Sequence, residues 1–141
     1  MKYKKLQKGK ITGYVQEDAL IFGNLGIKVS EPGRISPETL EAMRRVIKKP
    51  LPRTKERKSK NKILFRVFAN RPYTKKPQEV RMGKGKGAVK GYEVKVKAGR
   101  VIVEVLVTNE LRTSMFNGLT KALHKLGLKS FIIERSSSLP F

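Results

Sequence analysis

The chain is 141 residues long, and 33 Lys and Arg against 11 Asp and Glu give it a formal net charge of +22. Such a charge repels itself unless an anion neutralises it, so the composition indicates a polyanionic partner. The chain has no Cys, which excludes disulfides, thiolate zinc sites and cysteine nucleophiles. The length suits one domain over residues 1–141. No run of about 18 apolar residues could span a bilayer, and residues 1–10 lack the apolar segment of a secretory signal, so we expect neither membrane insertion nor export.

Most of the charge lies in the first hundred residues, which hold 28 basic and 8 acidic side chains, against 5 and 3 in residues 101–141. Residues 1–12 are predicted to form an extended basic arm, because their dense lysines make them too polar to pack. Residues 49–62, with two prolines and many charges, are predicted to form a basic connector loop.

The predicted elements of the N-terminal half are short. Residues 19–22 and 27–29 are apolar runs on either side of a glycine-containing turn, which indicates two strands. Ser36 suits an N-cap and Pro37 suits the first helical position, so a helix is predicted to run from here to about residue 49. Residues 63–68 predict a strand, and residues 71–78, with two prolines, predict an extended connector.

In the C-terminal half, residues 92–97 and 100–107 flank Ala98 and Gly99 and predict a β-hairpin. A second helix is predicted from an Asn109 cap to Gly127, followed by a strand at residues 131–133. Together the elements predict an α+β fold with a small antiparallel or mixed sheet, two helices packed on one face, and basic loops and an N-terminal arm around it. The aromatic side chains assigned to the core are Phe65, Phe68, Phe116 and Phe131.

Residues 81–91, RMGKGKGAVKG, carry four basic side chains, four glycines and no acid. Glycine allows a positive φ and lets a backbone N–H approach an oxyanion, while lysines supply mobile charges for phosphate. This Gly/Lys-rich loop therefore indicates binding in a groove of folded nucleic acid. The plain alternative is a flexible surface hairpin kept soluble by its lysines. A P-loop or dinucleotide site is disfavoured, because no Ser or Thr follows either lysine of the GKGKG run and a strand comes next.

Residues 71–105, and above all the heptad RMGKGKG at residues 81–87, closely resemble the hallmark region of the bacterial-type family of the sixteenth protein of the large ribosomal subunit. Weaker matches, in the family's order, are FGNLGIK at residues 22–28, GRIS at 33–36 and LEAMRRVI at 40–47. Tyr92 in place of a usual Trp, Ala98 in place of a usual Pro, and a longer lysine-rich stretch at residues 50–62 depart from the bacterial pattern. These departures favour a mitochondrial ribosome, with the bacterial cytoplasm or a plastid as alternatives.

The resemblance implies a structural protein whose loop and arm enter large-subunit rRNA near the peptidyl transferase region. It also implies a place beside the cleft that receives A-site tRNA, a part in tRNA positioning and late subunit assembly, and no catalysis. The implied partners are large-subunit rRNA, tRNA in the A-site cleft and neighbouring ribosomal proteins. No cofactor, metal, membrane or homo-oligomer is expected.

The residues expected to bind rRNA or tRNA fall into four groups. Two prolines keep the stretch after residue 70 extended, so its cations could follow a phosphate backbone, while Tyr73 either stacks on an unpaired base or packs at a strand end. Two arginines lie beside the apolar stripe of the first helix, where the alternative to RNA contact is simple solvation. The arm is expected to become ordered only on RNA. With the loop, the set is Arg81, Met82, Gly83, Lys84, Gly85, Lys86, Gly87, Lys90, Arg71, Tyr73, Lys75, Lys76, Lys4, Lys5, Lys8, Lys10, Arg44 and Arg45.

A DNA-binding or chromatin-like protein is the alternative that the charge alone also allows. A DNA reader usually presents a recognition helix, whereas here the charge is concentrated in loops and an arm. An enzyme is disfavoured, because the acids are dispersed and His124, the single histidine, has no nucleophile beside it in sequence.

Overall fold

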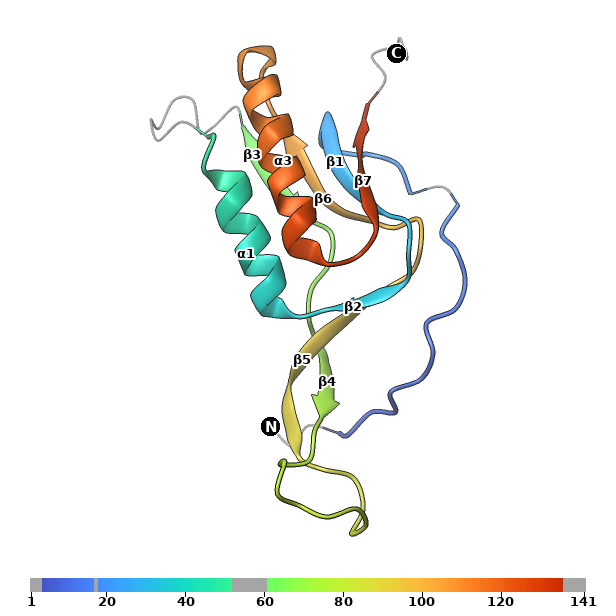
Figure 1. Cartoon of the computed structure of the whole chain (residues 1–141). Helices are drawn as coiled ribbons and strands as arrows, with labels where there is room; N and C mark the ends of the chain where they lie inside the picture. Colours follow the sequence, from blue (N-terminus) through green and yellow to red (C-terminus); the bar gives the residue numbers. More distant parts are fainter. Residues whose placement is uncertain (1–3, 17, 52–60, 136–141) are drawn as a thin grey trace.

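The structure is a computed structural model that describes residues 4–16, 18–51 and 61–135. Within these residues it contains two α-helices and two small antiparallel sheets, which confirms the predicted α+β class. Figure 1 shows both helices on one face of the larger sheet, and the smaller sheet extending away from them toward an open loop at the far end of the molecule.

The larger sheet has the strand order β3-β6-β1-β7, and every neighbouring pair is antiparallel. Its strands are β1 (Leu25–Val29), β3 (Lys62–Phe65), β6 (Val101–Leu106) and β7 (Ser130–Glu134). The smaller sheet has the order β2-β5-β4 and is also antiparallel. It consists of β2 (Gly33–Ile35), β4 (Arg71–Thr74) and β5 (Val89–Val96).

Both helices begin and end close to the predicted residues. In α1 (Pro37–Lys48) the Thr39 N–H donates to Ser36 Oγ at 3.2 Å, which confirms the predicted N-cap. α3 (Arg112–Leu126) begins later than predicted, and Asn109 does not cap it. Asn109–Leu111 form a short 3₁₀ turn instead, and no side chain among the described residues caps the N-terminus of α3. Gly127 ends α3 at a φ of 70°, as a left-handed C-cap requires.

The core lies between the two helices and the larger sheet. Fully buried aliphatic side chains of β1 and β6 meet Met43 and Ile47 of α1 and Met115 and Leu119 of α3 in one cluster. Phe65 packs against this cluster from its edge.

The core assignment was wrong for three of the four aromatic residues. Phe68, Phe116 and Phe131 are 79%, 41% and 46% exposed. Phe68 lies beyond the end of β3, Phe116 follows the buried Met115 on the outer side of α3, and Phe131 lies on an edge strand. Aliphatic and methionine side chains fill the core in their place.

The predicted hairpin is not formed, because its two strands belong to different sheets. β5 pairs with β2 and β4, whereas β6 pairs with β1 and β3. Between them Gly99, at a φ of 82°, donates its N–H to Val29 O at 2.7 Å. The residues predicted as a connector, 71–78, instead begin with β4, where Pro72 is tolerated on an edge strand.

Residues 19–22 are not a strand, and a buried carboxylate explains their conformation. Glu104 of β6 is 1% exposed and accepts the N–H groups of Ile21, Phe22 and Gly23 at 3.0, 2.7 and 2.9 Å. The same carboxylate accepts from Arg66 at 2.9 Å, and Arg66 also pairs with Asp18 at 2.6 Å. A side chain therefore binds the N–H groups that a neighbouring strand would otherwise have taken.

Candidate nucleic-acid interface

The Gly/Lys-rich loop is carried on a two-stranded ribbon. β4 and β5 pair antiparallel and extend from the body, and the chain between them forms the open loop in Figure 1. The Lys75 N–H donates to Ala88 O at 3.2 Å and closes the base of the loop. Residues 77–86 are all exposed, so the loop presents its side chains and backbone outward.

The backbone at the tip of the loop takes a conformation that only a glycine-rich sequence adopts readily. Gly83, Lys84 and Gly85 have φ values of 104°, 56° and 78°, so three successive residues are left-handed. A Cβ at Gly83 or Gly85 would have no neighbour within 4 Å. At Gly87, in contrast, a Cβ would lie 2.9 Å from the backbone of Lys75, so this glycine allows a close approach at the base of the loop. The glycines thus shape the tip and narrow the base.

Some cations of the loop donate hydrogen bonds to backbone oxygens, and others do not. Lys76 Nζ donates to Gly83 O across the loop, and Lys86 Nζ donates to Leu6 O of the arm. Arg81 and Lys84 are exposed and make no hydrogen bond or ion pair to any residue that the structure describes. Met82, between them, is 98% exposed.

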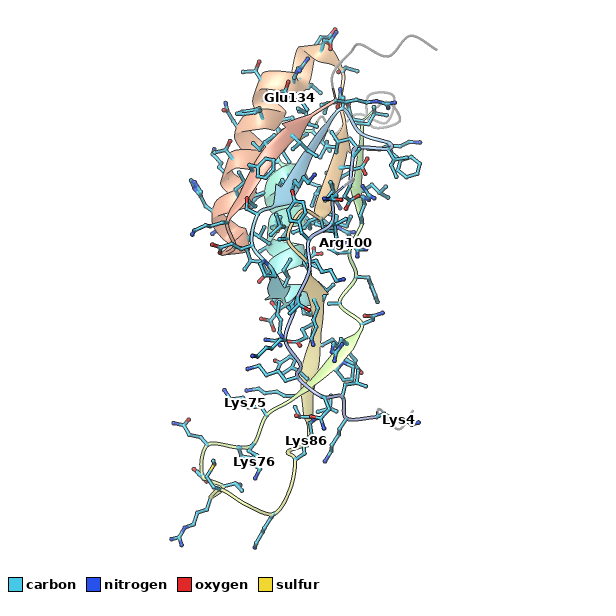
Figure 2. All side chains as sticks on the ribbon, turned by 90° about the vertical axis from the view of Figure 1, so that its right-hand side faces the viewer. Lys4, Lys75, Lys76, Lys86, Arg100 and Glu134 are labelled. Carbon is cyan, nitrogen blue, oxygen red and sulfur yellow. The ribbon has the colours of Figure 1, made fainter. Side chains whose placement is uncertain are left out.

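The arm lies along the smaller sheet, and cationic side chains bind its carbonyl oxygens. Arg71 donates to Gln7 O at 2.7 Å, and Arg34 donates to Gly9 O at 2.7 Å and to Lys8 O at 3.2 Å. Lys95 also donates to Lys8 O. Figure 2 shows Lys75, Lys76, Lys86 and the arm's Lys4 at the same end of the molecule, with Arg100 about halfway along it and Glu134 near the other end. That the arm becomes ordered only on RNA stays a prediction.

A pocket lies between the arm and the ribbon. Its lining includes five of the residues singled out from the sequence, which are Lys8, Arg71, Tyr73, Lys75 and Lys86, and also Arg34 and Glu93. Tyr73 is 36% exposed, and its ring lies 3.0 Å from the position of a Cβ on Gly91, so it both packs on a strand and lines the pocket. The lining is strongly cationic. Its carboxylate, that of Glu93, pairs with Arg34, whose Nε lies 3.2 Å from Glu93 Oε1.

Two cations here were not singled out from the sequence: Arg34, which lines the pocket, and Lys95, which lies beside Arg34 but does not line it. They lie on β2 and β5, and their strands are paired directly, with Arg34 opposite Lys95. Partial burial and then the positive charges of Arg71 and Arg34 lower the pKa of Lys95. The three cations therefore lie close enough to repel one another at this end of the smaller sheet.

Other expected residues lie apart from the pocket. Arg44 and Arg45 are on α1, where Arg44 lies over the ring of Phe65 at 5.1 Å and Arg45 pairs with Glu41 at 3.6 Å. Lys90 is exposed on β5. The predicted connector loop at residues 49–62 falls mostly outside the described residues, as do residues 1–3 of the arm.

Two absences among the described residues concern membranes and metals. No helix among them is long and apolar enough to cross a membrane. In the same part of the chain, no group of three or more His, Asp and Glu side chains is placed so that it could hold a metal ion.

The family model for ribosomal protein L16p/L10e matches residues 1–133. The chain belongs to this family. It is 41% identical to the large ribosomal subunit protein uL16 of Thermus thermophilus over 138 residues, which cover 97% of this chain and 92% of that protein. It is 38% identical to uL16 of Acinetobacter baylyi over 137 residues, which cover 96% and 93% of the two chains.

Membership of the uL16 family confirms the coarser predictions made from the sequence. The chain is a protein of the large ribosomal subunit with a structural and not an enzymatic role, and rRNA and other ribosomal proteins are its partners. Its place is the ribosome. Both of these uL16 relatives are bacterial, so they give no support to the predicted mitochondrial location.

Proposed function

We propose that the chain binds large-subunit rRNA with the loop at residues 81–87, the arm and the pocket between the arm and the ribbon. The observation that carries the proposal is the exposed loop, with three successive left-handed residues, three cations and no acid. Backbone N–H groups in such a conformation can face a phosphate, and the lysines neutralise it. The pocket supplies further cations at the base of the loop.

The layout of charge favours folded RNA over duplex DNA. The cations of the interface come from strands, a loop and an extended arm, whereas a duplex reader usually places a helix in the major groove. α3, the longer helix, carries one arginine and two lysines over its length. A narrow loop on a ribbon can enter between strands of a folded RNA, where a helix would not fit.

The place of this interface in the ribosome follows from the family resemblance. The loop would point toward the peptidyl transferase region, and the protein would lie beside the cleft that receives A-site tRNA. There it would help to position tRNA, and it would join the subunit late in assembly. Arg44 and Arg45, both exposed on α1, offer a second surface for rRNA or tRNA.

Salt dependence of rRNA binding tests the proposed role of the loop. Each of Lys84→Ala and Lys86→Ala should flatten the slope of log affinity against log salt by up to about 0.9, because each variant leaves one phosphate un-neutralised. Lys121→Ala, which removes an exposed lysine of α3, is the matched control and should leave the slope unchanged. Affinity for large-subunit rRNA, measured between low and high KCl with duplex DNA as competitor, gives the result. Wild-type slopes in both loop variants would rule out phosphate binding by these lysines.

A further inference from the structure

A second exposed surface lies beside α1 and has no part in the loop interface. It is a groove between the first turns of α1 and the segment that joins β3 to β4, and the two elements run next to each other in Figure 1. We name it the Phe68 groove. The lining residues that matter here are Leu40, Glu41, Arg44, Phe65, Val67 and Phe68.

Phe68 presents its ring at the edge of this groove. The side chain is 79% exposed, although Val67 before it is buried at 8% exposure and anchors the segment. The Asn70 N–H donates to Phe68 O at 3.1 Å and closes a tight turn, which holds the backbone at Phe68 in place. The ring therefore gains little from burial within the free chain, yet it is attached to ordered backbone.

Arg44 supplies a second flat surface on the same groove. Its guanidinium lies over the ring of Phe65, 5.1 Å from the centroid, and this cation–π contact fixes its position. The Arg44 side chain is nevertheless exposed, so the groove offers both an aromatic ring and a guanidinium. Exposed aromatic rings and guanidinium planes are the groups on which proteins stack unpaired RNA bases.

The charges around the groove indicate what fills it. Arg44, Arg45 and Lys48 are exposed along α1, while the apolar floor comes from Leu40 and Val67. Glu41, half exposed and 3.6 Å from Arg45, provides an acceptor for the N–H groups of a base edge. Arg44 is the cation in the lining of this apolar slot, and Arg45 and Lys48 lie outside the lining on the same helix. This arrangement matches a flat base joined to phosphates, whereas an apolar protein segment would leave these cations without a counter-charge.

We propose that the Phe68 groove binds one unstacked base of large-subunit rRNA, with Phe68 as the stacking residue and α1 contacting the flanking phosphates. The inference rests on the proposed function, since it takes rRNA as the ligand. It differs in chemistry from the loop, because stacking contributes affinity without adding a cation.

Substitutions of Phe68 in the full chain test this assignment. The measured quantity is the affinity of each variant for purified bacterial large-subunit rRNA. Phe68→Ala should weaken binding about five- to a hundredfold, the range that loss of one stacked base produces. Its salt slope should equal that of the wild type, because no charge is removed. Phe68→Trp should bind within about twofold of the wild type. Phe116→Ala, the same change at an exposed phenylalanine of α3, should have no effect.

Three results would overturn the assignment, and they have different meanings. Wild-type affinity in Phe68→Ala would show that the groove takes no base, and loss of subunit incorporation in that variant would then identify a protein partner. Weaker binding in both Phe68→Ala and Phe68→Trp would show that the ring has only a structural role. A wild-type chain that binds rRNA no more tightly than heparin would refute the proposed function itself, together with the inference.

Discussion

Glu104→Gln should lower the free energy of unfolding by about 3 kcal/mol, the cost of breaking a buried ion pair by neutralising one partner. The wild-type carboxylate accepts three successive backbone N–H groups and the Arg66 guanidinium. A glutamine can offer one acceptor oxygen, and its amide N–H₂ would face donors. Urea denaturation at neutral pH measures the difference.

The pH dependence of stability should change in the same variant. Burial raises the pKa of Glu104, but the N–H groups of Gly23, Phe22 and Ile21 and the charge of Arg66 outweigh it, so the pKa lies below the ordinary value of 4.5. A lowered pKa contributes stability that is present above the unfolded-state value and is lost as pH falls through the folded-state value. Glu104→Gln should therefore lose less stability on acidification than the wild type.

Glu110→Gln is the matched control, because Glu110 is an exposed carboxylate at the start of the 3₁₀ turn. It should unfold like the wild type at every pH. If Glu104→Gln lowered the free energy of unfolding no more than Glu110→Gln does, the Glu104 carboxylate would not be the group that holds residues 21–23 against β6.

Gly99→Ala should lower the free energy of unfolding by roughly 2–4 kcal/mol. The alanine would have to adopt a left-handed conformation, and its Cβ would meet a crowded backbone. Gly99 has a φ of 82°, and a Cβ there would lie 2.3 Å from Val15 O and 2.8 Å from Cζ of Tyr14. The segment at Tyr14 and Val15, which follows the arm, would have to move away, and the hydrogen bond from the Val15 N–H to Ala98 O, 2.9 Å long, would break. Denaturation gives the stability, and amide exchange at Val15 reports on this segment.

Gly127→Ala separates backbone strain from crowding. Gly127 has a φ of 70°, but a Cβ there would meet no atom within 4 Å. This variant should cost about 1 kcal/mol and leave amide exchange at Val15 unchanged. Equal losses of unfolding free energy at the two glycines would show that Tyr14 and Val15 do not pack against Gly99.

Local signals in the sequence were sufficient for the loop and for the helix ends except the start of α3, which Asn109 does not cap. Ser36, Pro37 and Gly127 act on their own neighbours along the chain, and the structure uses them as predicted. The left-handed backbone at Gly83 and Gly85 likewise follows from the glycines themselves.

Strand pairing could not be predicted in the same way, because partners are chosen by tertiary contacts. The alternation on both sides of Ala98–Gly99 suits a hairpin, yet β5 and β6 find partners in different sheets. Glu104 is another example. In sequence it reads as the polar position of an alternating strand, and only the fold brings residues 21–23 to its carboxylate.

The candidate site shows the same division. Arg71, Tyr73, Lys75 and Lys86 are near one another in sequence and line one pocket. Arg34 and Lys95 are 61 positions apart in the numbering and become neighbours through the pairing of β2 with β5. No local pattern in the chain indicates that contact.

Lysine acylation of the free protein and of assembled large subunits, followed by mass spectrometry, tests most directly whether the loop enters rRNA. Lys84 and Lys86 are exposed in the free chain and should be modified there readily. In assembled subunits both should be strongly protected, and removal of the rRNA by nuclease should restore modification. If the two lysines were modified equally fast in free protein and in intact subunits, the loop would lie in solvent and the proposed function would be contradicted.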